Sequence, residues 1–572
     1  MAYDLVIKNG TVVDGTGMPR ARTDIGIRKG RVVARGRLDP AGAKVIDAEG
    51  KIVAPGFVDI HTHYDAQILW DPLLTCSPWH GTTTVVMGNC GYSLAPALPR
   101  DQQYLAEMFA EVEGMNLKTL EAGLDWRWRS FPDYLDRIAG QPVGLNVATL
   151  VGHSALRRCV IGEEANKRAS TPDEVTQMQR LFHEGLAAGA FGLSTSRSAN
   201  HSGMDHLPVP SRLASEQELL DLATVLREFH IGSIEIITDG VFRSDRFPES
   251  DEKLLMELSY LSGRPVNYNE LSQSSDTPNA WKNQIEFMER ASRAGAQIYA
   301  VARNQRLDLM FSLDGTNLLD SWPKWKEVMA APHAKKLQLF KDPAVRAALK
   351  EDFRSLAVRR PLHRQEGSLQ FVISATGRYA KYQRRTLVEL GKELGKDPLD
   401  ILLDWSIDED LQATFAFMGV RNGDPAAVAE ILKSPYALAG ISDAGAHTDR
   451  MSGSYYSTFL LCHWVRDQKI LTLEEAIRSL TLVPASLYGI SDRGLIREGL
   501  PADIVIFDLE KLDYLPPERL MDFPGGQARM ATRAAGYEHL IVNGEVVMTQ
   551  GQATGTLPGK VLRSTSYSGN GG

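Results

Sequence analysis

Apolar and polar residues alternate in short runs near both ends of the chain. Asp4–Lys8 has the alternation of a strand, and Asn9-Gly10 directly after it predicts a hairpin turn. Ala502–Phe507 shows the same pattern close to the C-terminus. We therefore predict one small β-sandwich domain that both termini build together, over residues 1–55 and 490–562.

The middle of the chain has a different rhythm, in which apolar runs of strand length alternate with amphipathic helical stretches. Ser170–Glu174 carries the start signals of a helix over Val175–Ala188, and Ser215 with Glu218 predicts a capping box at the start of another helix. The eight strand-like runs are Ile52–Asp59, Thr83–Met87, Leu145–Leu150, Phe191–Ser194, Ile234–Ile237, Val266–Tyr268, Ile298–Val301 and Ala437–Ile441.

Eight strands that alternate with helices predict an α/β protein with a (β/α)8 TIM-like barrel over residues 56–489. A doubly wound open sheet is the alternative that the pattern alone leaves open. Residues 305–435 are too many for a single connection, so we expect a helical insertion between the seventh and eighth strands. In such a barrel the loops after the strands carry the chemistry.

Composition and charge narrow the classes of function. Hydrophobic residues make up 43% of the 572 and charged residues 23%, a balance typical of a globular protein. Lys and Arg number 63 against 71 Asp and Glu, and this net charge of −8 argues against nucleic acid or an anionic membrane as partner. The 4 cysteines are too few for a disulfide framework and indicate a reducing compartment, for which we expect the cytoplasm. No apolar run approaches the ~18 residues of a membrane span.

The first strand-like run is followed by His61-Thr62-His63. Residues i and i+2 on a strand face the same side, so the two imidazoles are placed to bind one transition metal ion such as zinc. Two histidines with this spacing also occur by chance at protein surfaces, and the spacing alone leaves that alternative open.

Two further residues follow other predicted strands. Asp443 stands after the eighth strand, where a carboxylate can bind a metal ion and accept a proton from water that the ion activates. The alternative is an Asx turn before Gly445. Cys90 follows the second strand and can bind zinc as a thiolate, although a free cysteine is more often buried and inert.

The chain as a whole resembles the amidohydrolase superfamily, and within it the D-aminoacylase (N-acyl-D-amino-acid deacylase) branch. The motifs that carry the resemblance are DLVIKNGTVVDGTG, VIDAEGKIVAPGFVDIHTHYD, GTTTVVMGNCGYSLAP, LVGHSALR, FGLSTS and GLIREGLPADIVIFD. The resemblance implies a barrel with a β-sandwich of both termini, a zinc-activated water and hydrolysis of an amide bond. It also implies that His61, His63 and Cys90 bind the metal, and that Asp443 acts at the metal as general base and acid.

The sequence departs from this family's pattern at the fifth and sixth strands. The family has a histidine at the end of each, whereas the matching stretches here contain Glu235 and Glu270 and no histidine. We therefore expect zinc as one or two ions and favour one, with these two glutamates as substitutes for ligands or as residues behind the ligands.

Other polar residues near strand ends are predicted to play supporting roles. We expect His153 and His201 to hydrogen-bond behind the metal ligands. Arg197 and Arg450 are candidates for binding a substrate carboxylate, with a solvated surface position as the alternative for both.

The leading prediction is metal-dependent hydrolysis of an acyclic amide in a small N-acyl compound, an N-acyl-D-amino acid or a related amide. Cyclic-amide hydrolysis or deamination is an alternative, because the same barrel supports both. A barrel that binds a small ligand without turning it over is the alternative from another class, and the joint presence of His61, His63 and Asp443 argues against it. The expected partner is thus a small-molecule amide; its acyl and amine groups, its stereochemistry and a homo-oligomeric state stay open.

Overall fold

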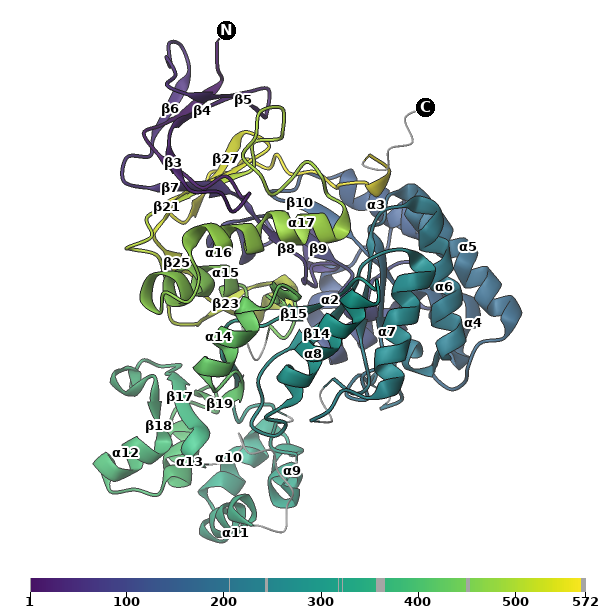
Figure 1. The fold of residues 1–572 in the computed structure, drawn as a ribbon. Helices are drawn as coiled ribbons and strands as arrows, with labels where there is room; N and C mark the ends of the chain where they lie inside the picture. Colours follow the sequence, from purple (N-terminus) through teal and green to yellow (C-terminus); the bar gives the residue numbers. More distant parts are fainter. Residues whose placement is uncertain are drawn as a thin grey trace.

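Parallel strands from the middle of the chain close into a barrel in the computed structural model, which describes residues 2–566 except 205, 242–244, 317, 321, 356–365 and 449–452 (Figure 1). One sheet contains β8–β10 and another contains β11–β15 with β20; a parallel bridge between Thr62 and Ala444 joins the last strand to the first. The predicted (β/α)8 barrel is confirmed. Its strands are β8 (Phe57–Asp59), β9 (Thr82–Met87), β10 (Asn146–Thr149) continued by β11 (Val151–Gly152), β12 (Gly192–Ser196), β13 (Ser233–Ile237), β14 (Val266–Leu271), β15 (Ile298–Ala302) and β20 (Ala437–Ala439).

The predicted first strand, Ile52–Asp59, is divided between two sheets at Gly56. Residues before Gly56 form β7 (Ile52–Pro55), which pairs with strands of the terminal β-sandwich, and residues after it form β8 of the barrel. A Cβ atom on Gly56 would lie 2.1 Å from the side chain of Thr83, so only glycine fits this close approach. Expecting one continuous strand was therefore wrong.

Both termini contribute to the β-sandwich, as predicted. A four-stranded sheet in the order β5-β4-β1-β6 packs against a seven-stranded sheet in the order β28-β27-β26-β21-β7-β2-β3, and Ile7, Ile25, Ile504 and Ile541 belong to the shared core. The strands are β1 (Leu5–Lys8), β2 (Thr11–Val12), β3 (Ala21–Arg22), β4 (Asp24–Arg28), β5 (Arg31–Gly36), β6 (Lys44–Asp47), β21 (Ile504–Phe507), β26 (Tyr537–Val542), β27 (Glu545–Thr549) and β28 (Gln552–Ala553).

The hairpin predicted at Asn9-Gly10 does not form. β1 pairs with β4 and β6, whereas β2 pairs with β3 and β7 in the other sheet, so this turn carries the chain from one sheet to the other. The same dipeptide at Asn543-Gly544 does join paired strands, β26 and β27. The local preference for a tight turn is the same in both places, and the packing of the two sheets decides which strands pair.

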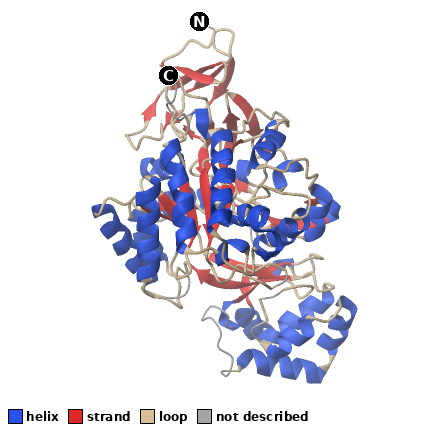
Figure 2. Ribbon diagram, turned by 90° about the vertical axis from the view of Figure 1, so that its right-hand side faces the viewer, coloured by secondary structure: helices blue, strands red, loops and turns tan. Residues whose placement is uncertain are grey.

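Helices cover the outside of the barrel (Figure 2). The helix predicted after the start signals of Ser170–Glu174 forms as α5 (Pro172–Ala188), and Thr171 and Glu174 make a capping box at its start. None of the helices in the described part of the chain has the length and apolarity needed to cross a membrane. Other helices of the barrel and its loops are α1 (Gln102–Glu113), α2 (Leu117–Gly123), α3 (Phe131–Ala139), α4 (His153–Ile161), α6 (Glu216–Phe229), α7 (Glu249–Ser262), α8 (Ala280–Arg293), α14 (Pro425–Lys433), α15 (Tyr456–Phe459), α16 (Leu473–Leu480) and α17 (Leu482–Tyr488).

The capping box predicted for α6 is only half formed. Ser215 accepts a hydrogen bond from the Glu218 backbone N–H, as an N-cap residue does. The Glu218 carboxylate does not return to Ser215, because it bonds to the buried side chains of His153 and Arg157. The Glu218 carboxylate therefore belongs to a buried ion pair and does not complete the capping box with the Ser215 backbone.

The insertion between β15 and β20 is not purely helical, which corrects the expectation for residues 305–435. It contains a four-stranded antiparallel sheet in the order β16-β19-β17-β18 beside its helices, and it projects from the barrel (Figure 1). Trp322, Trp325 and Phe340 are fully buried in a core of its own. Its elements are β16 (Leu307–Phe311), α9 (Pro323–Met329), α10 (His333–Lys341), α11 (Pro343–Arg354), β17 (Leu369–Ile373), β18 (Arg385–Thr386), α12 (Leu387–Leu394), α13 (Pro398–Asp408) and β19 (Thr414–Arg421).

Candidate active site

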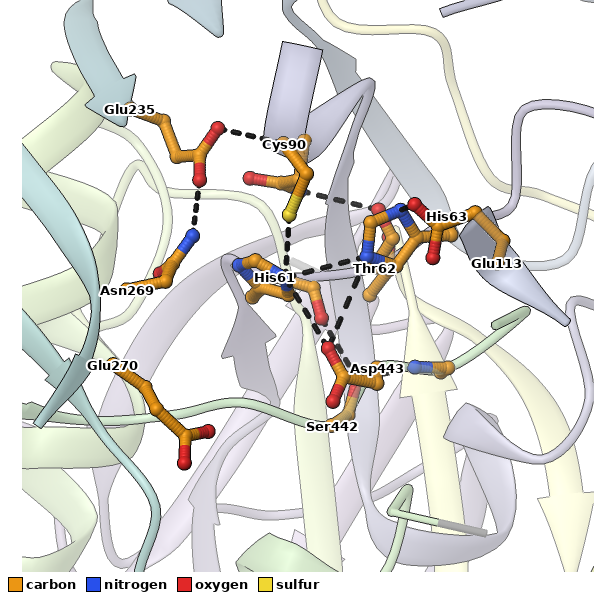
Figure 3. Close-up of polar contacts among 12 residues, drawn as sticks. His61, Thr62, His63, Cys90, Glu113, Glu235, Asn269, Glu270, Ser442 and Asp443 are labelled. Atoms are coloured by element: carbon orange, nitrogen blue, oxygen red, sulfur yellow. Dashed lines mark hydrogen bonds and ion pairs between the residues drawn. The ribbon is translucent and has the colours of Figure 1, made fainter. Parts of the chain in front are cut away.

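Two histidines converge directly after β8, at the mouth of the barrel (Figure 3). His61 and His63 are 2% and 1% exposed, and their Nε2 atoms lie 3.3 Å apart. Thr62, between them, pairs with Val86 and Ala444 on the neighbouring strand ends, which fixes the backbone that carries both rings. The expected same-side placement of the two imidazoles is therefore what the structure has.

Cys90 and Asp443 reach the same point from two other strand ends. Cys90 lies in a short turn, Asn89–Gly91, after β9, and its Sγ is 3.5 Å from Nε2 of His61. Asp443 follows β20, and its Oδ1 is 3.2 Å from Nε2 of His61 and 3.9 Å from Nε2 of His63. Both residues have a positive φ, 59° for Cys90 and 47° for Asp443, a backbone conformation that side chains other than glycine seldom adopt.

The separations among these donor atoms suit one zinc ion. Zn–N bonds of about 2.0–2.1 Å and Zn–S bonds of about 2.3 Å place neighbouring tetrahedral donors about 3.3–3.6 Å apart. Three of the observed separations, 3.2, 3.3 and 3.5 Å, lie at or close to this range. Among the described residues, His61, His63 and Cys90 also form a buried group whose ligand atoms all lie within 4.8 Å of one another. Two imidazoles, a thiol and a carboxylate thus fit a metal centre.

Burial and charge set the protonation of this group. Burial, followed by the carboxylates Glu235 and Glu113, raises the pKa of the Cys90 thiol well above its ordinary value, so a cation is needed to hold it as a thiolate. Burial would also raise the pKa of Asp443, but its hydrogen bond with His61 and the charge of Arg303 outweigh that and hold the pKa well below its usual range. Asp443 is therefore an ionised carboxylate.

The two glutamates at the fifth and sixth strands lie close to this group but bond to protein groups. Glu235, on β13, accepts a hydrogen bond from the Cys90 backbone N–H at 2.7 Å and another from the Asn269 side chain (Figure 3). Burial raises the pKa of Glu235 to about 7. Glu270, on β14, accepts a hydrogen bond from Nε of Arg303 at 3.0 Å. Glu235 therefore positions the Cys90 turn, and Glu270 holds an arginine.

Sequence reasoning missed two residues of the site. Arg303 follows β15, is 4% exposed, and donates from Nη2 to Oδ2 of Asp443 at 2.8 Å. Its position directly after the seventh strand is a signal that could have found it. Glu113 is the last residue of α1, and its Oε1 lies 3.3 Å from Nδ1 of His63. Glu113 ends a helix and does not directly follow a barrel strand in the sequence, so its position gives no comparable signal.

The remaining predicted residues are divided between the site and its surroundings. His201 lines the same cavity as His61 and bonds to Ser196, and burial lowers its pKa to about 3, so the ring is neutral. His153 bonds to Thr195 and Glu218 in a buried network. Arg197 lies 3.5 Å from Glu216, which is half exposed, and is not among the described residues that line the cavity. Arg450 lies outside the described residues.

Two cavities meet at Arg303. The first, of about 300 Å³, is lined by the metal-site residues together with Glu113, His201 and Glu270. The second, of about 480 Å³, is bordered by the aromatic side chains of Tyr455, Phe459 and Tyr514. Arg303 and Leu307 line both, so the Arg303 side chain stands in the wall between the two spaces. Volumes of this size are typical of small-molecule sites.

A closed barrel that brings histidine, cysteine and carboxylate donors together after its strands defines a class, the metal-dependent barrel hydrolases. The model of the Amidohydrolase family matches residues 44–548. The chain belongs to this family, whose members are hydrolases of carbon–nitrogen bonds other than peptide bonds.

Similar proteins agree with this assignment over the full length of the chain. An N-acyl-D-aspartate deacylase of Alcaligenes xylosoxydans xylosoxydans is 30% identical over 568 residues, which cover 98% of this chain and 95% of that protein. A D-aminoacylase structure described as having a binuclear metal centre, with one-metal activation and second-metal attenuation, is 26% identical, with a TM-score of 0.66 over 98% of this chain and 100% of that one. An N-acyl-D-glutamate deacylase of Bordetella bronchiseptica, solved with zinc and a phosphonate inhibitor, is 25% identical, with a TM-score of 0.65 over the same shares.

Proposed function

We propose that this protein hydrolyses the amide bond of a small N-acyl amino acid, of the D series, or of a related acyclic amide. The observation that carries the proposal is the convergence of His61, His63, Cys90 and Asp443 at separations that suit one zinc ion. The similarity to deacylases of N-acyl-D-amino acids, one of them solved with zinc, supports the same metal and the same class of substrate.

His61, His63 and Cys90 would hold the ion, since three protein ligands and an open position are the arrangement of a catalytic zinc site. Asp443 would face that open position, where its carboxylate can bind the ion or accept a proton from water. Bound zinc supplies Lewis acidity, which polarises a carbonyl group and lowers the pKa of water toward ~7.

The protein's own residues move the proton. Asp443 accepts a proton from the attacking water and passes it to the nitrogen of the leaving amine, the role of a general base and then a general acid. Arg303 holds the carboxylate in place through Oδ2, so Oδ1 stays turned toward the histidines. The neutral ring of His201 and the buried side chain of Glu113 complete the polar wall of the cavity.

A substrate panel with metal analysis tests the proposal. Protein purified without chelator should contain zinc and should hydrolyse N-acyl-D-amino acids, with no turnover of hydantoins or aminopyrimidines, the substrates of the alternative activities. Loss of activity after chelation and its return with zinc would tie the reaction to the ion. Protein without zinc, or zinc-loaded protein that is inactive on every acyclic amide of the panel, contradicts the proposal.

The Cys90→Ser variant should retain less zinc than the parent protein. A hydroxyl does not replace a thiolate as a ligand for a soft cation. Because the loss is in metal binding, the melting temperature in saturating zinc should stay near the parent value. Elemental analysis and a thermal melt of the same sample measure both effects.

If Cys90 is only packed at the barrel mouth, the two readouts reverse. Zinc content would then stay at the parent level, and the hydroxyl in an apolar environment would lower stability by about 1–3 kcal/mol. Cys462→Ser is the matched control, because Cys462 is also buried but lies in η8 (Leu460–Asp467), a helical segment that does not line the cavity of the metal site.

A further inference from the structure

We propose that Arg303 takes the place of a second metal ion and limits this site to one zinc per chain. The inference deepens the proposed function and rests on it, since it concerns the same metal site. It assigns a role to a buried cation that no motif of the sequence brings to attention.

The guanidinium group of Arg303 is fixed between two carboxylates from different strands. Nη2 donates to Oδ2 of Asp443 at 2.8 Å, and Nε donates to Oε2 of Glu270 at 3.0 Å. Both ion pairs are buried, with side-chain exposures of 4% for Arg303, 7% for Glu270 and 11% for Asp443. A cation held by two acids from the sixth and eighth strands therefore lies in the wall of the cavity that contains the two histidines, with Asp443 in contact with both Arg303 and His61.

Three carboxylates beside the metal ligands, Glu235, Asp443 and Glu270, already bond to protein groups. Both oxygens of Glu235 accept hydrogen bonds, from the Cys90 backbone N–H and from Asn269. Asp443 divides its oxygens between His61 and Arg303, and Glu270 is bound to Arg303. A second zinc ion would have to displace these protein donors, whereas the first ion finds His61, His63 and Cys90 already converged.

The charge of Arg303 also disfavours a second ion at this position. Arginine keeps its positive charge at every pH a protein tolerates, and like charges in a buried, weakly screened pocket repel each other over several ångströms. A zinc ion beside Glu270 would compete with the Arg303 guanidinium for Oε2 of Glu270. The D-aminoacylase structure described above has a binuclear centre in which the second metal attenuates activity; here a side chain would fix the one-metal state.

Zinc titration of Arg303→Gln, which removes the charge, and of Arg303→Lys, which keeps a charge, tests the inference. Wild-type protein and Arg303→Lys should saturate at one zinc per chain. Arg303→Gln should approach two zinc ions per chain under conditions in which the wild type stops at one, because two carboxylates lose their buried counter-charge. Arg306→Met is the surface control, since Arg306 pairs with Asp308 at a half-exposed position.

The melting temperature gives a readout that needs no activity. A ligand that binds only the folded state stabilises it as its concentration rises. The wild-type melting temperature should stop rising after one equivalent of zinc, whereas that of Arg303→Gln should rise again with the second. A merely structural arginine would lower the melting temperature of the variant without producing this second rise.

Each outcome separates this inference from the proposed function. Wild-type protein with two zinc ions, or folded Arg303→Gln that stops at one, overturns the role of Arg303 and leaves the proposed function in place. Wild-type protein without zinc, and with a melting temperature that zinc does not change, overturns the proposed function itself. If Arg303→Gln fails to fold, Arg303→Met, which fills the same space without the charge, replaces it in the titration. A folded Arg303→Met that stops at one zinc overturns the inference, and one that approaches two supports it.

Discussion

Replacing Asp443 with asparagine should lower kcat by about 10²–10⁴-fold, the usual contribution of a general base or acid. KM should change much less, because the asparagine side chain is nearly isosteric with aspartate and the other residues that line the cavity are unchanged. The carboxamide can still accept a hydrogen bond from Arg303 through its oxygen, so the fold and the pocket should persist. What the variant lacks is the ionised oxygen that faces His61 at 3.2 Å.

The measurement has to separate proton transfer from metal loss, since Asp443 also faces the metal ligands. Steady-state kinetics in saturating zinc, with the zinc content of each sample determined, makes that separation. Asp467→Asn is the matched control: Asp467 pairs with Arg466 at a half-exposed surface position, and its kcat should equal that of the parent. A fully metallated Asp443→Asn enzyme with kcat within about threefold of the parent, far inside the range above, would reject the assigned role.

The part of the site that follows strand periodicity could be predicted from the sequence. His61 and His63 are two residues apart at a strand end, and Asp443 and Cys90 each follow an apolar run, so the closed barrel had to bring their backbones to one rim. The alternation of runs and helices predicted the barrel and left a doubly wound open sheet as the alternative. These features depend on local spacing, which a sequence displays directly.

The contacts that tune the site depend on side chains that meet only in the folded protein. Arg303 is one arginine among many in the sequence, and its role appears only when Glu270 and Asp443 lie beside it. The same limit applies to the fold. Gly56 divides a strand because Thr83 stands against it, and the turn at Asn9 joins two sheets because tertiary packing overrides a local hairpin preference.

Replacing Glu218 with glutamine should lower the free energy of unfolding by about 3–5 kcal/mol at pH 7, the usual effect of removing one partner of a buried ion pair. Glu218 is fully buried and bonds to Arg157 and to Nε2 of His153, the latter at 2.8 Å. Ser170 donates a further hydrogen bond to its carboxylate at 2.6 Å. The variant leaves the Arg157 guanidinium buried without its counter-charge, which is the physical source of the loss.

The loss should depend on pH in a defined direction. Burial raises the pKa of Glu218, but the hydrogen bond with His153 and the charge of Arg157 outweigh it and lower the pKa to about 2 from the ordinary 4.5. A carboxylate with a depressed folded-state pKa contributes its full stability above the unfolded-state value and loses it as the pH falls toward the folded-state value. The difference between wild type and Glu218→Gln should therefore be constant above pH 4.5 and shrink between pH 4.5 and 2.

Urea unfolding at pH 7, 5 and 3, followed by tryptophan fluorescence, measures that difference. Glu216→Gln is the matched control on the same helix, because Glu216 is half exposed and pairs with Arg197 at the long distance of 3.5 Å. This substitution should change the free energy of unfolding by no more than about 0.5 kcal/mol. A Glu218→Gln variant as stable as this control at pH 7 would show that the buried pair merely balances its own desolvation. A difference between wild type and variant that grows toward pH 3 would mean that the carboxylate is not the ionised partner that its contacts with Arg157 and His153 require.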